Sequence, residues 1–138
     1  MIAAAPEMEI CGMRSLRLFI GIALAAATSV FAIGSAQAEE TFTFRIKSDY
    51  QYKVQVAFFS QSRNFVWPGP GRAFSLDDSQ TQSFPLQCRS GEEICYGAWV
   101  TGDGSETWGV GPKNDQSCKK CCFVCGDGDM SPVLTLSE

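Results

Sequence analysis

Cysteines are the residues of this chain with the clearest potential for chemistry. Apart from Cys11 there are six, two of them at Cys88 and Cys95. The other four have the spacing C-x-x-C-C-x-x-C: Cys118, Cys121, Cys122 and Cys125. Four thiolates could hold a zinc ion, and C-x-x-C pairs could cycle between dithiol and disulfide. The spacing alone therefore leaves a metal site, a redox module and structural disulfides open.

Disulfide bonds are the interpretation that we favour for all six. The number is even, and the chain carries the features of an exported protein. Zinc sites usually take two ligands from each of two separated knuckles, whereas these four thiols lie within eight residues. Cys88 and Cys95 flank residues 89–93, which we interpret as a hairpin loop, so these two could bond across its strands. Fifteen pairings are possible for six cysteines, and the sequence leaves the connectivity open.

No histidine is present, so the commonest general base and the commonest metal ligand are missing. A hydrolase would need paired carboxylates instead. The candidates all lie in segments that we interpret as turns: Asp77, Asp78, Glu92, Glu93, Asp103, Glu106, Asp127 and Asp129. The Asp127-Gly128-Asp129 run supplies only two side-chain oxygens, fewer than a calcium loop needs. We therefore predict no catalytic residue and no cofactor.

Aromatic side chains are the most suggestive binding groups. Exposed indole and phenol rings provide flat apolar platforms with one polar edge. Trp67 lies beside two Pro-Gly steps and Trp108 lies in a Gly-rich run, so both are expected near loops. We predict a ligand-binding patch formed by Trp67, Trp108 and Tyr96, and assign Trp99 to the core.

The elements that must position these residues are short strands. Apolar residues recur with period two between turn residues, and little of the chain after residue 38 favours a helix. The expected strands are 41–47, 54–59, 73–76, 83–88, 94–101, 107–110 and 133–136. Pro85 predicts an edge strand or a bulge, and residues 67–71 predict an irregular loop. The pattern predicts an all-β, disulfide-stabilised β-sandwich or small barrel of seven or eight short antiparallel strands.

An export signal precedes these strands. Met13 opens a segment with two arginines, the apolar run 18–33 follows, and Ala36-Gln37-Ala38 provides a cleavage site. The run is shorter than the roughly 20 residues of a membrane-spanning helix, although an uncleaved anchor is the alternative. We predict that 1–38 is an upstream extension plus signal peptide, with Met13 as the start, and that 39–138 is one mature domain.

The charge balance restricts the partners of this domain. The net charge of the chain is −4, and no basic stripe is present. This argues against nucleic acid and against anionic membranes. A periplasmic or secreted domain is expected, without a stable membrane anchor after cleavage.

Two resemblances add to this interpretation. The run 91–99, the Trp108-Gly109-Val110-Gly111 run and the cysteine cluster resemble small exported cysteine-rich bacterial proteins. Strand order and aromatic placement also resemble the aegerolysin-type β-sandwiches, which bind membrane lipids. That second resemblance implies a sandwich and a lipid ligand, but no motif is shared and the cysteine framework differs.

A non-catalytic binding or structural domain is the function that these observations favour. Its ligand is expected to be a carbohydrate, a lipid headgroup or a protein. A zinc or thiol-redox module on the cysteine cluster is the alternative, and a small carboxylate-based hydrolase is the third.

Overall fold

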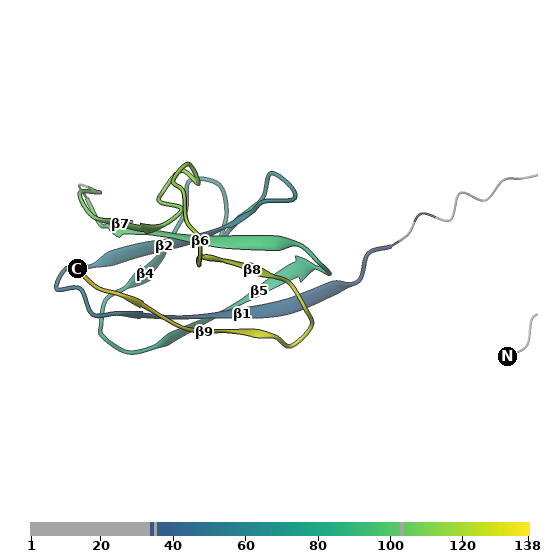
Figure 1. Ribbon diagram of the computed structural model, residues 1–138, viewed down its shortest axis with the longest axis horizontal. Helices are drawn as coiled ribbons and strands as arrows, with labels where there is room; N and C mark the ends of the chain where they lie inside the picture. Colours follow the sequence, from purple (N-terminus) through teal and green to yellow (C-terminus); the bar gives the residue numbers. More distant parts are fainter. Residues whose placement is uncertain (1–33, 35, 103) are drawn as a thin grey trace, which may run out of the picture. The chain divides into compact units, whose positions relative to one another are not determined.

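The chain forms nine strands in two sheets within residues 34, 36–102 and 104–138, which are the residues described by the computed structural model (Figure 1). The strands are β1 (Glu39–Ser48), β2 (Val54–Ser60), β3 (Val66–Trp67), β4 (Phe74–Leu76), β5 (Gln82–Arg89), β6 (Glu93–Val100), β7 (Thr107–Gly109), β8 (Cys122–Val124) and β9 (Met130–Leu136). Neither sheet closes into a barrel among these residues. The predicted all-β fold is confirmed. The predicted signal peptide lies almost wholly outside the described residues.

The smaller sheet has the strand order β5-β1-β9. Phe42 and Phe44 of β1 point inward opposite Leu86 and Phe84 of β5, as the alternation predicts. Pro85 lies on an edge strand, where its missing amide hydrogen costs no ladder bond. The prediction that all strands pair antiparallel is wrong for β1 and β9, which run parallel. The chain crosses from the other sheet before β9, and such crossovers allow parallel pairing.

The larger sheet has the order β3-β2-β6-β7, with β4 also paired to β2 and β8 also paired to β6. In β6, Ile94, Ala98 and Val100 are buried, whereas the intervening Cys95 and Trp99 face the opposite side of the sheet. The predicted hairpin between the strands at 94–101 and 107–110 is confirmed by the β6–β7 pairing. Strands β3 and β8 were not predicted, because β3 includes Trp67 of the expected irregular loop 67–71 and β8 lies inside the cysteine cluster.

A single apolar core lies between the two sheets, and both contribute to it. Its largest fully buried side chains come from six strands: Phe44, Phe58, Ile46, Leu76, Leu86, Ile94, Leu136, Val54 and Val56. Burying a side chain of this size contributes about 1.5–3 kcal/mol. A second, smaller cluster on the outer face of the larger sheet contains Ala57, Phe59, Cys95, Val110 and Cys121.

Three disulfides form among the described residues, and each has a partner within residues 118–125; two of them link that segment to β5 and β6, and the third closes a short ring inside it. The pairs are Cys88–Cys125, Cys95–Cys122 and Cys118–Cys121. The predicted hairpin loop at residues 89–93 is wrong because β5 and β6 belong to different sheets, and the Cys88–Cys95 bond that it would have allowed does not form. Three disulfides indicate an oxidising, extracytoplasmic environment. Among the described residues, no helix is long and apolar enough to span a membrane.

Two glycines allow the 107–111 turn to lie against β6. A Cβ at Gly97 would collide with the carbonyl oxygen of Gly111, and one at Gly109 would collide with the carbonyl oxygen of Tyr96. Gly109 also has a φ of 63°, which glycine adopts without a steric penalty. The Trp108-Gly109-Val110-Gly111 run is therefore explained by close backbone packing.

A Gly97→Ala substitution is expected to lower the free energy of unfolding by about 2 kcal/mol, because backbone atoms would have to move. Urea unfolding measures this loss. Gly69→Ala is the matched control, because a Cβ there would lie 3.6 Å from the flexible Arg72 side chain. Equal midpoints for Gly97→Ala and the unchanged protein would contradict the close approach.

Candidate functional site

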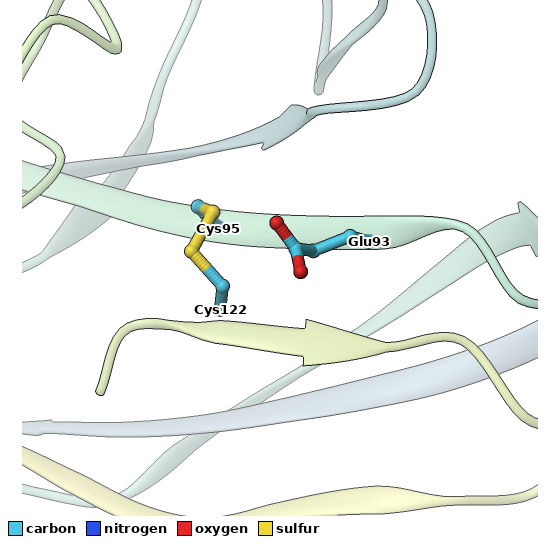
Figure 2. A group of neighbouring side chains, drawn as sticks. All are labelled: Glu93, Cys95 and Cys122. Carbon is cyan, nitrogen blue, oxygen red and sulfur yellow. A yellow bond between two sulfur atoms is a disulfide. The ribbon is translucent and has the colours of Figure 1, made fainter. Parts of the chain in front are cut away.

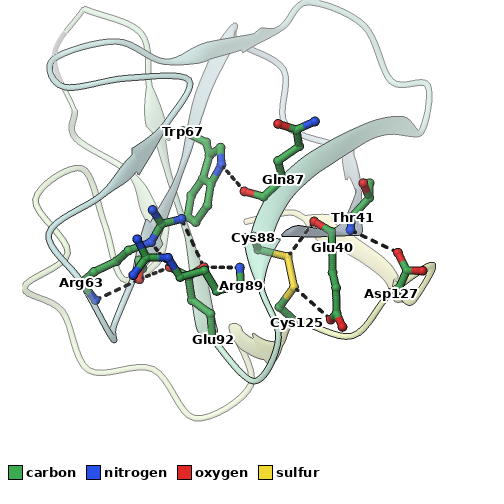
Figure 3. The surroundings of a disulfide bond; sticks show 11 residues. Glu40, Thr41, Arg63, Trp67, Gln87, Cys88, Arg89, Glu92, Cys125 and Asp127 are labelled. Carbon is green, nitrogen blue, oxygen red and sulfur yellow. Dashed lines mark hydrogen bonds and ion pairs between the residues drawn. A yellow bond between two sulfur atoms is a disulfide. The ribbon is translucent and has the colours of Figure 1, made fainter. Parts of the chain in front are cut away.

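The three aromatic residues predicted to bind a ligand do not form one patch. Trp67 is buried at 8% exposure on β3, and its Nε1 donates a hydrogen bond to the backbone oxygen of Gln87 at 3.1 Å (Figure 3). Trp108 is half-buried on β7, at the other end of the strand order. Tyr96 lies half-buried on β6, and burial raises the pKa of its hydroxyl. Trp67 and Tyr96 therefore belong mainly to the packed interior.

Trp108 instead joins two tyrosines of the β1–β2 loop. The Tyr50 ring meets the Trp108 ring edge-on, with centroids 5.2 Å apart, and meets the Tyr52 ring edge-on at 5.8 Å. Trp108 is itself held by a 2.8 Å hydrogen bond from its Nε1 to the backbone oxygen of Ser137. Tyr52 is the outermost ring and is 59% exposed. The result is a row of three rings that runs from the core to solvent.

This row borders an open hollow of about 470 Å³. We call it the tyrosine hollow; its lining is Tyr50, Tyr52, Lys53, Val100, Thr101 and Ser105. The β1–β2 loop and the chain directly after β6 supply these residues, because Val54 and Val100 pair at the adjoining ends of β2 and β6. A second hollow of about 240 Å³ also has Tyr50, Tyr52 and Lys53 in its wall. Tyr50, Tyr52 and Lys53 are thus shared by two neighbouring depressions.

The polar groups around the tyrosine hollow are of both charges. The Lys53 ammonium lies 3.2 Å from the Asp77 carboxylate, and both side chains are more than half exposed. The Asp78 carboxylate accepts a hydrogen bond from the backbone nitrogen of Gln80, and this bond stabilises the turn that contains both residues. Asp103, one of the predicted carboxylates, lies outside the described residues.

Glu92 is a buried carboxylate (Figure 3). It lies near the Ser60–Ile94 end of the β2–β6 pair, whereas the tyrosine hollow borders the Val54–Val100 end. Its Oε1 accepts hydrogen bonds from the Ser60 hydroxyl and from Arg63 Nε, both at 2.6 Å. Its Oε2 accepts hydrogen bonds from the Arg89 backbone nitrogen at 2.9 Å and from Arg63 Nη2 at 3.3 Å. The Arg63 guanidinium also lies 4.3 Å from the Phe65 ring centre. Glu92 therefore joins the β2–β3 loop to the β5–β6 turn.

These contacts determine the ionisation of Glu92. Burial alone raises the pKa of its carboxyl, but the hydrogen bonds from Arg63, Arg89 and Ser60 and the charge of Arg63 lower that pKa below its ordinary value. A general acid needs a raised pKa. Glu92 is therefore an ionised structural group.

The four clustered cysteines do not converge on one point. Cys125 bonds to Cys88 in the core between the sheets, whereas Cys121 packs in the outer cluster. These four residues therefore have no common centre for the zinc site that was the alternative to disulfides. A different trio does converge: Glu93, Cys95 and Cys122 have ligand atoms within 4.8 Å of one another (Figure 2). Two of these atoms are sulfurs bonded to each other, so the oxidised protein has no thiolates to offer there.

Tyr52, the exposed ring, was not among the residues predicted to bind a ligand. Its signal is the Tyr50-Gln51-Tyr52 run between two strongly alternating strands, which places aromatic residues in a turn. Comparisons of the chain with protein-family models, with curated proteins and with solved structures found no match. The resemblances drawn from the sequence therefore identify no family.

Proposed function

We propose that this chain is a non-catalytic binding domain of the periplasm or the cell exterior, and that the tyrosine hollow holds a carbohydrate. The row formed by Trp108, Tyr50 and Tyr52 carries the proposal. A sugar ring presents C–H groups on its faces and hydroxyls at its edge. The exposed Tyr52 ring suits the faces, and the Lys53 and Thr101 side chains of the lining suit the hydroxyls, as does Asp77, which is paired with Lys53 beside the hollow.

Preorganisation supports this assignment. Tyr50 lies between two rings, and Trp108 is fixed by its hydrogen bond to Ser137, so two members of the row are ordered before a ligand arrives. Binding then costs little side-chain entropy beyond that of Tyr52. Three disulfides and a continuous core keep the supporting strands in place.

Charge favours a carbohydrate over an anionic lipid. Lys53 is paired with Asp77 at the hollow, and the chain carries a net charge of −4. A surface that binds anionic headgroups usually carries unpaired basic residues.

The test is a screen of neutral and acidic oligosaccharides followed by calorimetric titration of each that binds. Tyr52→Ala is expected to weaken binding at least tenfold, whereas Tyr52→Phe retains the ring and is expected to stay within about threefold. Tenfold corresponds to about 1.4 kcal/mol. Phe65→Ala is the matched control, because Phe65 is an exposed aromatic residue (43%) of the β2–β3 loop, away from the hollow.

Three outcomes would overturn the proposal. A saccharide that binds Tyr52→Ala as tightly as the unchanged protein would place the site elsewhere. Binding to vesicles of phosphatidylserine and phosphatidylcholine, with no saccharide bound, would make the ligand a lipid. If neither a saccharide nor the vesicles bind, the domain is not a binding module of this kind, and the structural role predicted from the sequence takes its place.

A further inference from the structure

The Cys118–Cys121 disulfide lies in surroundings unlike those of the other two. Cys118 is half-buried, in a segment that belongs to no strand. The two residues inside its ring, Lys119 and Lys120, are both exposed. By contrast, Cys88 and Cys125 are 1% and 3% exposed in the core. An external thiol can therefore approach Cys118 but not the Cys88–Cys125 pair.

The lysines favour exchange at this disulfide. Positive charge near a sulfur stabilises its thiolate, and thiolates with a lowered pKa leave faster when a disulfide is attacked. Lys119 and Lys120 are the two residues between the cysteines of this ring, and both are exposed.

A second disulfide lies directly beside the first. The Sγ atoms of Cys121 and Cys122 are 3.8 Å apart, although each is bonded to a different partner. A thiolate formed on Cys121 would thus lie close to the sulfur of the Cys95–Cys122 bond. The Cys88–Cys125 bond belongs to the other apolar cluster.

We propose that Cys118–Cys121 is a thiol–disulfide exchange site for an external dithiol, and that Cys121 passes the exchange on to Cys95–Cys122. A thiolate of the external dithiol attacks Sγ of Cys118, and the Cys118–Cys121 bond breaks with Cys121 leaving as a thiolate. The second external thiol, once deprotonated, attacks the external sulfur of the mixed disulfide and releases the Cys118 thiolate. The external dithiol is oxidised by two electrons, the cysteine pair is reduced by two, and the two protons of the external dithiol pass to that pair.

The inner step exchanges one disulfide for another without a net change in oxidation state. The Cys121 thiolate attacks Sγ of Cys122, the Cys95–Cys122 bond breaks, and Cys95 leaves as a thiolate and takes up a proton. A Cys121–Cys122 disulfide forms. The free thiol thereby moves to β6, beside the Glu93 carboxylate (Figure 2).

Graded reduction of the exported, fully oxidised protein tests the outer step. Samples in dithiothreitol are quenched with acid at intervals, alkylated after denaturation and mapped as peptides. Cys118 is expected to be labelled at least tenfold faster than Cys88 and Cys125. Replacing Lys119 and Lys120 with glutamine is expected to slow that labelling severalfold. Labelling of all six cysteines at one common rate would overturn the proposal, because it would mean that reduction requires unfolding.

Cys118→Ser tests the inner step, since it leaves Cys121 without its partner. Peptide mapping of the native variant is expected to find a Cys121–Cys122 disulfide and a free thiol on Cys95. Cys88→Ser is the matched control, and its free thiol is expected to stay on Cys125. A thiol that stays wholly on Cys121 in Cys118→Ser would overturn the inner step. The reduction rates of the unchanged protein decide the outer step independently, even if a variant folds poorly.

Discussion

Replacing Arg63 with alanine is expected to lower the free energy of unfolding by about 3–5 kcal/mol, because it leaves a buried carboxylate without its countercharge. The Glu92 side chain is 2% exposed, whereas that of Arg63 is 27% exposed. The loss should therefore exceed that of an ordinary surface ion pair, which contributes up to about 1 kcal/mol. Urea unfolding at pH 7 measures it, with Arg89→Ala as the control that keeps the backbone hydrogen bond to Glu92.

The same pair predicts a pH dependence with a definite sign. The folded-state pKa of Glu92 is lowered, so its ionised form stabilises the protein above the ordinary glutamate pKa of about 4.3. That contribution is lost as the pH falls through the lowered pKa. In Arg63→Ala, Glu92 remains buried but its countercharge is gone. The difference in the free energy of unfolding between the unchanged protein and this variant should therefore become smaller at acid pH, where Glu92 is protonated. A difference that is constant between pH 7 and pH 3, at fixed ionic strength, would contradict the role of this ion pair.

Removing the Cys88–Cys125 disulfide is expected to have an effect of similar size. This bond closes a loop with a sequence separation of 37, for which the chain-entropy estimate is about 4 kcal/mol. Substituting both cysteines with alanine leaves no free thiol and no buried hydroxyl. Thermal unfolding should then occur about 20 °C lower.

The Cys118–Cys121 pair is the matched comparison for this experiment. Its sequence separation is only 3, and the same estimate gives about 2 kcal/mol. The double alanine variant of that pair should therefore unfold at a clearly higher temperature than the variant without Cys88 and Cys125. The opposite order would show that the short ring, and not the core bond, holds the domain together.

Strand positions were largely predictable, because alternation is a local property of the sequence. The expected 54–59, 83–88 and 94–101 correspond to β2, β5 and β6 within one residue at each end. Pairing is a non-local property. The alternation of apolar residues in β6 fits pairing with β2 and pairing with β5 equally well. The wrong hairpin at residues 89–93 follows from that single ambiguity, since a short connection can join strands of one sheet or of two.

The candidate site was predictable only in part, for a related reason. Trp108 was recognised as a loop-side aromatic residue, but which rings accompany it depends on how loops from different sheets meet. Tyr50 follows β1 and Trp108 lies on β7, and only the packing of the two sheets brings them to 5.2 Å. Trp67 lies equally close to a loop, yet β3 turns its indole toward β5.

The order in which cysteines reach an oxidising compartment follows from their pairing. A chain that emerges with its N-terminus first presents Cys88 and Cys95 before residues 118–125, which hold a partner of every native disulfide. Cys11 lies in the segment predicted to be removed as a signal peptide; without it, the first two thiols have only each other during that interval. Cells that lack a disulfide isomerase should therefore accumulate protein with a mispaired Cys88–Cys95 bond, and the yield of native protein becomes a measure of isomerase capacity.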